Sequence, residues 1–308
     1  TNQPHATYPR LFSPLTLPCG LEMRNRSLMG SMHTGLEEHR GLKEMAAFYA
    51  ERAKGGAGLI VTGGVAPNRE GWVLPLAGKM STVAEAEEHK VVTSAVHENG
   101  GKIALQILHA GRYAYHPFAV APSKKKAPIN VVTPRALSES DVQRTISDFA
   151  RTAELARSCG YDGVEIMGSE GYLINEFLAE RTNQRRDAYG GSFENRSRLA
   201  LDVVQAVRKA AGPDFAVVFR LSMLELVENG MAFDEVVSLA HLLDESGVDI
   251  LNTGIGWHEA RVPTIATCVP RGAFVFATMN VREALLAKYG QAPLMCATNR
   301  INTAETCE

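Results

Sequence analysis

The stretch that decides the fold is AVVFRLSM at Ala216–Met223, followed by FDEVVSLAHLLDES at Phe233–Ser246 and ILNTGI at Ile250–Ile255. Short β-branched, apolar runs predict strands, and apolar residues spaced three or four apart predict a helix, which Gly247 ends. Because both runs are apolar almost throughout, they are typical of parallel strands that are covered on both faces. The stretch therefore predicts a strand, a crossover helix and a second, parallel strand.

The same alternation extends through the chain. Further strands are predicted at Ser27–Met32, Gly58–Val65, Lys102–His109, Gly163–Gly168 and Leu294–Arg300. Further helices are predicted at Leu42–Lys54, Ala84–Asn99, Glu139–Ser158, Asn195–Ala211 and Thr278–Tyr289. No predicted strand is followed by a G-x-G-x-x-G turn, which favours a closed barrel over an open doubly wound sheet. We expect an α/β fold, a TIM (β/α)8 barrel, with a β-hairpin at Leu15–Arg26 that covers the amino ends of its strands.

The barrel predicted from this pattern lacks its last part. After the seventh strand only Ile301–Glu308 remain, too few residues for a seventh helix and an eighth strand–helix unit. We therefore expect residues 1–308 to form one domain, a C-terminally truncated barrel, and expect the chain to be a fragment of a longer protein.

The composition excludes several classes of protein. The 308 residues are 45% hydrophobic and 21% charged, with a formal net charge of -2. A chain so close to neutral is not expected to bind nucleic acid or an anionic membrane, and no apolar run approaches the roughly 20 residues that span a bilayer. The five cysteines form no C-x-x-C pair, so we expect reduced thiols, no metal site and a cytoplasmic location.

Candidate functional residues lie at the carboxyl ends of the predicted strands, where TIM barrels carry their chemistry. They are Ser31, Met32, His33, Gly64, Gln106, His109, Glu170, Tyr172, Arg220, His258, Glu259, Ala260, Arg261 and Arg300. The set contains no H-x-H pair, no lysine at a strand end and no evident pair of catalytic carboxylates. It therefore disfavours a metal-dependent hydrolase, a Schiff-base aldolase and a glycosidase.

A planar, electron-accepting cofactor suits this set better. Small residues such as Gly64 let the backbone approach a flat ring, and Gln106 offers a donor and an acceptor to an imide-like edge. Arg220 supplies positive charge where a reduced ring becomes anionic. The residue types alone therefore suggest a flavin or a similar group.

Structural roles remain open for the same residues. Arg220 could pair with a carboxylate such as Glu165, Gln106 could be a satisfied core amide, and Tyr172 could serve in packing. His33, His97 and His109 could each be structural. The triple lysine Lys124–Lys126 is typical of a solvated loop, although it could meet a phosphorylated substrate.

Four segments carry a resemblance to a known family. Arg181–Arg196, RTNQRRDAYGGSFENR, resembles the N-x-R-x-D-x-Y-G-G-S-x-E-N-R signature of the old yellow enzymes. Gly30–Glu38, Met167–Phe177 and Asn252–Arg261 are similar to the bacterial NADPH-dependent 2,4-dienoyl-CoA reductases within that family. The resemblance extends from about Tyr8 to Asn302.

This resemblance implies a set of residue roles. Residues implied to hold FMN are Ser31, Met32, Gly64, Gln106, Arg220 and Arg300. Tyr172 is implied to be the proton donor, with His258 beside it and Glu170 tuning the pair. Residues implied to meet the acyl-CoA substrate are His258, Glu259, Ala260 and Arg261 in the pocket and Arg181 at the CoA portion. Hydride from FMN N5 and a proton from Tyr172 would then reduce a 2,4-dienoyl-CoA to a 2-enoyl-CoA in fatty-acid β-oxidation.

The resemblance also implies parts that this sequence does not contain. Complete family members add an eighth strand, a [4Fe–4S] centre and a region that binds FAD and NADPH. Two alternatives stay open: a related FMN barrel that acts on other enones or on amines, and a truncated barrel that binds no flavin.

Overall fold

Seven parallel strands form one curved sheet in the computed structural model, which describes residues 5–38 and 42–308. The strands are β3 (Leu28–Met29), β4 (Leu59–Val61), β5 (Ile103–Ile107), β8 (Gly163–Gly168), β9 (Ala216–Leu224), β10 (Ile250–Ile255) and β11 (Met295–Cys296). Their order in the sheet, β11-β10-β9-β8-β5-β4-β3, follows the chain without a reversal. An open doubly wound sheet reverses its strand order, so this order confirms the α/β barrel arrangement.

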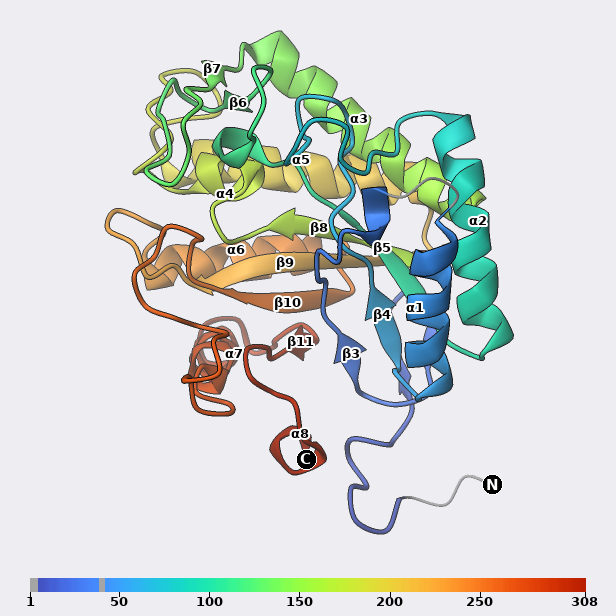
Figure 1. The fold of residues 1–308 in the computed structure, drawn as a ribbon. Coiled ribbons are helices and arrows are strands. Elements are labelled where there is room, and N and C mark those ends of the chain that lie inside the picture. The colour runs from blue at the N-terminus through green and yellow to red at the C-terminus, as the bar shows by residue number, and fades with distance from the viewer. Residues whose placement is uncertain (1–4, 39–41) are drawn as a thin grey trace.

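Helices follow the strands and cover the outside of the curved sheet (Figure 1). The main ones are α1 (Lys43–Lys54), α2 (Val83–Glu98), α3 (Glu139–Ser158), α5 (Phe193–Ala211), α6 (Phe233–Glu245) and α7 (Val275–Tyr289). These match the six helices predicted from the sequence, with shifted ends. Shorter helical turns are η1 (Leu36–Glu38), η2 (Gly111–Tyr113), α4 (Leu173–Leu178) and α8 (Ala304–Cys307). In the described part of the chain, no helix has both the length and the apolar character needed to cross a membrane.

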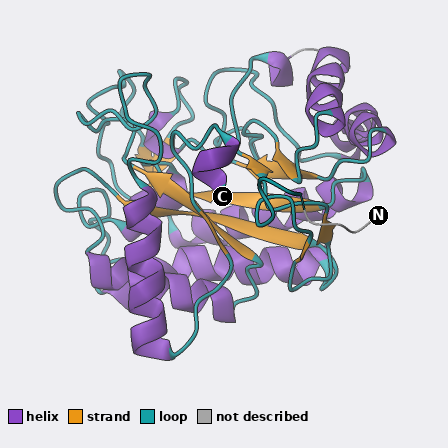
Figure 2. Cartoon of the chain, turned by 90° about the horizontal axis from the view of Figure 1, so that it is seen from below, coloured by secondary structure: helices purple, strands orange, loops and turns teal. Residues whose placement is uncertain are grey.

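The amino ends of the strands are covered by the predicted hairpin. It consists of β1 (Leu15–Thr16) and β2 (Glu22–Met23), which pair antiparallel. Buried Leu17 and Met23 pack in one apolar cluster with residues near the strand starts, including Leu59, Ala104 and Ile250. Figure 2 shows the strands inside a shell of helices and loops. The hairpin therefore occupies the barrel end opposite the one expected to carry the chemistry.

Several predicted strands are too long at their carboxyl ends. β3 ends at Met29, β4 at Val61 and β11 at Cys296, so Ser31, Gly64 and Arg300 lie in loops rather than in strands. Beyond β11 the predicted strand cannot reach Arg300, because Asn299 and Arg300 both have positive φ, 67° and 62°. That conformation cannot continue an extended strand.

The long connection between β5 and α3 contains a small sheet that the sequence did not predict. Its strands are β6 (Val120–Ala121) and β7 (Arg135–Ala136). Helix α3 then begins with a capping box, in which Ser138 and Asp141 each accept a backbone hydrogen bond at the helix start. The predicted opening of this helix is confirmed, and the connection lies at the barrel end where the strands finish.

Candidate active site

Tyr172 and His258 meet at the carboxyl end of the barrel. Tyr172 is the residue before α4, after β8, and His258 follows β10. The Tyr172 Oη and the His258 Nε2 lie 2.9 Å apart, and the two rings pack edge to face with centroids 5.0 Å apart. Tyr113, from η2, packs edge-on against both rings at 5.8 Å and 5.7 Å. Residues far apart in the sequence are therefore assembled into one phenol–imidazole pair.

The surroundings of this pair determine its protonation. Burial raises the pKa of the Tyr172 phenol above its usual value, and the nearby Glu170 carboxylate adds to the rise. Burial lowers the pKa of the His258 imidazole, an effect that Glu170 opposes and Arg220 supports. At neutral pH the phenol therefore keeps its proton and the imidazole is predominantly neutral, so an O–H···N hydrogen bond can join them.

Arg220 pairs with Glu170 across the same end of the barrel. The Arg220 Nη2 lies 2.6 Å from the Glu170 Oε1, and both side chains are mostly buried. Arg220 therefore does pair with a carboxylate, as considered from the sequence, but the carboxylate is that of Glu170 and not the suggested Glu165. Glu170 follows β8 with a positive φ of 62°, which turns its backbone out of the strand direction. The Arg220 Nε is buried and has no hydrogen-bond partner in the described residues.

Gln106 is hydrogen-bonded through its amide nitrogen, whereas its amide oxygen accepts no hydrogen bond from the described residues. Its Nε2 donates to the Glu165 Oε1 at 2.8 Å, and the Asn252 Nδ2 donates to the other oxygen of Glu165 at 2.6 Å. This arrangement orients the amide, and the Nε2 also lies 3.7 Å from the Met167 Sδ, so Gln106 is partly the satisfied core amide considered above. A Cβ added at Gly64 would lie 3.1 Å from the Gln106 Oε1 and 2.7 Å from the Leu108 side chain. Gly64 therefore lets its loop approach the amide oxygen closely.

These groups fit the polar edge of a flavin. The Arg220 Nε and the Asn252 Oδ1 are buried without partners in the described residues, and the Gln106 Oε1 accepts no hydrogen bond there. One unused donor and two unused acceptors in the barrel interior match an imide-like ring edge. Met32 keeps an exposed side chain after β3, while the Arg300 Nε donates to the Val269 carbonyl at 3.1 Å.

Glu259 lies beneath the phenol–imidazole pair rather than on open surface. Its carboxylate accepts from the Arg112 Nη2 at 2.6 Å, from the Tyr113 Oη at 3.1 Å and from the Arg181 Nη2. Only 2% of its side chain is exposed. Glu259 therefore positions the Arg112 and Arg181 guanidinium groups. Its neighbours Ala260 and Arg261 are accessible to solvent.

A second buried carboxylate joins the loops that carry the pair. The Glu225 Oε2 accepts from the Trp257 indole at 2.7 Å, and its Oε1 accepts from the Asn175 Nδ2 at 2.8 Å. The Asn175 Oδ1 in turn accepts from the Gly171 N–H at 2.8 Å. Gly171 and Trp257 adjoin the two members of the pair, so Glu225 holds both loops to one anchor.

Sequence reasoning missed this supporting network. Its members are Arg112, Tyr113, Asn175, Glu176, Glu225 and Trp257. Arg112 and Tyr113 could have been found, because they follow β5 closely and strand ends were the criterion. Glu225 directly follows β9, two residues beyond the predicted strand end. Asn175 and Glu176 lie inside α4, so the strand-end criterion did not select them.

Two histidines named from the sequence have other partners. His97 lies at the end of α2, and its Nε2 is 2.8 Å from the Asp162 carboxylate. The His33 Nε2 lies 3.4 Å from the Glu38 carboxylate. His109 is fully buried, and burial lowers the pKa of its imidazole to about 3. His258 is the histidine that contacts Tyr172.

Comparison with known proteins places the chain among flavin enzymes. The chain is 35% identical over 309 residues to a metal reductase of Desulforamulus reducens, a match that covers 97% of this chain and 44% of the reductase. It is 34% identical over 288 residues to a cinnamate reductase of Clostridium sporogenes, covering 82% of this chain and 42% of that protein. A solved 2-naphthoyl-CoA reductase complex superposes with a TM-score of 0.91 at 24% identity, over 98% of this chain and 48% of that one.

The chain spans less than half the length of each of these three proteins. The family model of the NADH:flavin oxidoreductase / NADH oxidase family matches residues 10–308, nearly the whole chain. The old yellow enzyme type of barrel expected from the sequence is thereby confirmed, and membership implies FMN as cofactor. The chain belongs to the NADH:flavin oxidoreductase / NADH oxidase family.

Proposed function

We propose that this chain is the FMN-binding barrel of an ene reductase whose substrates are 2,4-dienoyl-CoA thioesters. The observation that carries the proposal is the 2.9 Å contact between the Tyr172 Oη and the His258 Nε2. A phenol with a neutral imidazole beside it is suited to deliver one proton to a carbanion. The Arg220–Glu170 ion pair is close enough to influence the pKa of both members.

FMN, when bound, would supply from its N5 the hydride that reduces the conjugated chain of the thioester. The residues proposed to hold it are Ser31, Met32, Gly64, Gln106, Arg220 and Arg300. The unused Gln106 oxygen and the unpartnered Arg220 Nε support this part of the proposal.

Tyr172 is proposed to protonate the substrate. Its raised pKa keeps the phenol intact until hydride addition creates a strongly basic enolate. In the tautomer that carries its proton on Nε2, neutral His258 donates to the Tyr172 Oη. The phenol proton is then free for the substrate, and the phenolate that remains is stabilised. Glu170 tunes the pair, because its carboxylate raises the pKa of Tyr172 and neutralises Arg220.

The thioester end is proposed to lie against His258, Ala260 and Arg261, with Arg181 near the CoA portion. Glu259 takes part by holding Arg181. A cinnamate reductase among the relatives acts on an acid with a conjugated double bond, which supports this class of chemistry. In the whole protein, NADPH, FAD and a [4Fe–4S] centre are proposed to deliver electrons from regions outside this chain.

The test is reoxidation of the reduced protein. The chain is loaded with FMN, reduced with dithionite without oxygen, and mixed with a 2,4-dienoyl-CoA or with cyclohexenone. In a separate sample, the oxidised FMN-loaded chain is mixed with trimethylamine. The proposal expects the dienoyl-CoA to restore the visible band of oxidised flavin fastest, with a 2-enoyl-CoA as product. Faster reaction with cyclohexenone would reassign the substrate, oxidation of trimethylamine by the oxidised protein would reassign the reaction, and failure to bind FMN would refute the assignment.

A further inference from the structure

An open cavity of about 610 Å³ lies in the loops at the carboxyl end of the barrel, away from the residues of the phenol–imidazole pair. Three segments line it: the turn at Ser123 and Lys124 after β6, the start of α3 at Ser138, and the loop that precedes α5, which contains Gln184. Its size is within the range of small-ligand sites. None of the residues proposed to hold FMN lines it.

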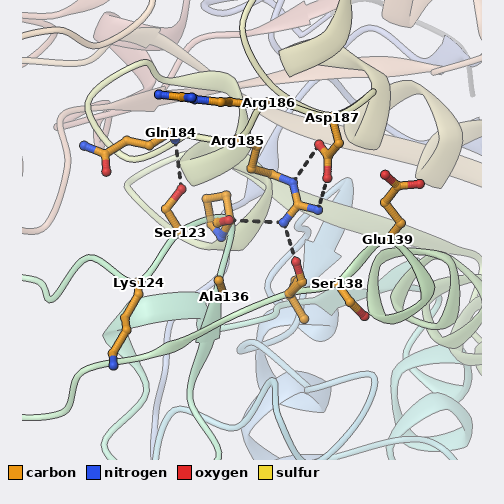
Figure 3. Close-up of a pocket in the computed structure, with 11 residues that line it drawn as sticks. Ser123, Lys124, Ala136, Ser138, Glu139, Gln184, Arg185, Arg186 and Asp187 are labelled. Atoms are coloured by element: carbon orange, nitrogen blue, oxygen red, sulfur yellow. Dashed lines mark hydrogen bonds and ion pairs between the residues drawn. The ribbon is translucent and has the colours of Figure 1, made fainter.

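A buried arginine builds this cavity. The Arg185 guanidinium donates to the carbonyls of Pro122, at 3.1 Å, and Leu137, and its Nε donates to Asp187 at 3.0 Å. Only 6% of the Arg185 side chain is exposed. Figure 3 shows Arg185 at the centre of the cavity with these contacts dashed. Because Arg185 joins segments far apart in the sequence, the cavity is preformed.

Two other cations face the cavity and are free to bind a ligand. Lys124 and Arg186 are exposed, and neither forms an ion pair with any described residue. Asp187 is neutralised by Arg185, and Glu139 lies on the opposite side from Lys124 in Figure 3. The cationic side of the cavity therefore suits phosphate groups.

The wall of the cavity is connected to the phenol–imidazole pair. The Gln184 N–H donates to the Ser123 Oγ at 2.8 Å, and Gln184 lies three residues after Arg181. Three extended residues span at most about 11 Å. The Arg181 guanidinium contacts Glu259, the residue after His258. A ligand with a long flexible arm can therefore reach from the cavity to the pair.

We propose that this cavity binds the phosphorylated nucleotide end of coenzyme A, with Lys124 and Arg186 as its phosphate-binding residues. This inference rests on the proposed acyl-CoA substrate. The nucleotide of CoA carries a diphosphate and a ribose phosphate, and its pantetheine arm joins them to the thioester. NADPH carries similar phosphates, so the experiment has to distinguish the two.

The test measures binding of CoA, pantetheine and NADPH to the FMN-loaded chain by isothermal titration calorimetry. Lys124→Ala and Arg186→Ala should each weaken CoA binding about five-fold, and the double variant about 25-fold, as expected for exposed charge pairs. Pantetheine binding should not change, and added salt should weaken CoA binding to the wild type. Lys126→Ala is the matched control, because Lys126 is exposed in the same lysine run but does not line the cavity.

Unchanged CoA affinity in the double variant overturns the inference. The inference is also overturned if the double variant loses as much affinity for pantetheine as for CoA, or if it loses affinity for NADPH alone. A dienoyl thioester of N-acetylcysteamine, which has no nucleotide, separates this inference from the proposed function. If this thioester reoxidises the reduced protein while CoA affinity is unchanged in the Lys124 and Arg186 variants, the proposed function stands and the cavity assignment fails. If CoA binding depends on both residues but no dienoyl thioester reacts, the cavity assignment stands and the function fails.

Discussion

The indole N–H of Trp257 donates a 2.7 Å hydrogen bond to Glu225, and this contact ties the loop after β10 to the end of β9. Asn175 donates to the other oxygen of the same carboxylate, from helix α4. Tyr172 immediately precedes α4, and His258 immediately follows Trp257. The separation of the phenol and the imidazole therefore depends on a carboxylate that touches neither of them.

Glu225→Gln should lower the turnover number for ene reduction about ten-fold while leaving KM and FMN affinity nearly unchanged. A carboxamide presents an NH2 to one of the two donors, Trp257 or Asn175, so one loop loses its anchor. The cost in unfolding free energy should be about 1–3 kcal/mol. Stopped-flow reoxidation and urea unfolding provide the two measurements.

Exposed Glu228 gives the control for this substitution, because Glu228→Gln makes the same chemical change on the same loop. Equal turnover in both variants would mean that Glu225 is structural only. A rise in KM without a change in turnover would mean that it positions substrate rather than the pair.

Tyr172→Phe should slow reoxidation of the reduced protein by a dienoyl-CoA about 100-fold or more, the usual contribution of a positioned proton donor. FMN binding should survive, because the substitution removes only the Oη that contacts His258. Rapid mixing measures the rate, and flavin absorbance measures the binding. Tyr115→Phe, at an exposed tyrosine, should behave as the wild type. Loss of the yellow colour in the Tyr172 variant would contradict the assigned role.

Gly64→Ala should weaken FMN binding at least ten-fold with little effect on the fold. The added methyl group would lie 2.7 Å from Leu108 and 3.1 Å from the Gln106 oxygen, so the loop has to move away from the amide. Titration of the apoprotein with FMN, followed by quenching of flavin fluorescence, gives the affinity. Gly55→Ala provides the comparison, since a Cβ there meets its neighbours at 3.4 Å. Wild-type affinity in the Gly64 variant would place the flavin elsewhere.

Glu176→Gln should make the protein more stable than the wild type at alkaline pH. Burial raises the pKa of the Glu176 carboxyl from 4.5 to about 8, while the nearby Arg112 opposes the rise. The folded state thus keeps a proton that the unfolded state releases, and wild-type stability falls as the pH rises from 4.5 through 8. Linkage sets this loss at roughly 3–5 kcal/mol. Urea unfolding of both proteins at pH 5, 7 and 9 measures it, and parallel curves would show that Glu176 is ionised when folded.

The fold could be predicted because its signal is repeated. Seven apolar runs alternate with amphipathic segments, and α6 ends just before Gly247, as the sequence indicated. The ends of the strands could not be predicted as well. Beyond β11, Asn299 and Arg300 take a left-handed conformation that rules out a strand extending to Arg300, and no nearby glycine signals this.

The candidate site could be predicted residue by residue but not contact by contact. Position after a strand was enough to select Tyr172, His258 and Arg220. The partner of Arg220 was not predictable, because the direction of Glu170 depends on its positive φ. Glu225 has no distinguishing sequence environment, and its importance arises only from donors that approach it from other loops.

One carboxylate shared by two guanidinium groups leaves a positive charge uncompensated. Arg112 and Arg181 both contact Glu259, and Glu176 is protonated at neutral pH and so cannot cancel the excess. The cluster is mostly buried, so water screens it weakly. The protein thus maintains a standing electric potential beneath its reaction centre, attractive to any electron-rich species formed there and present before a ligand arrives.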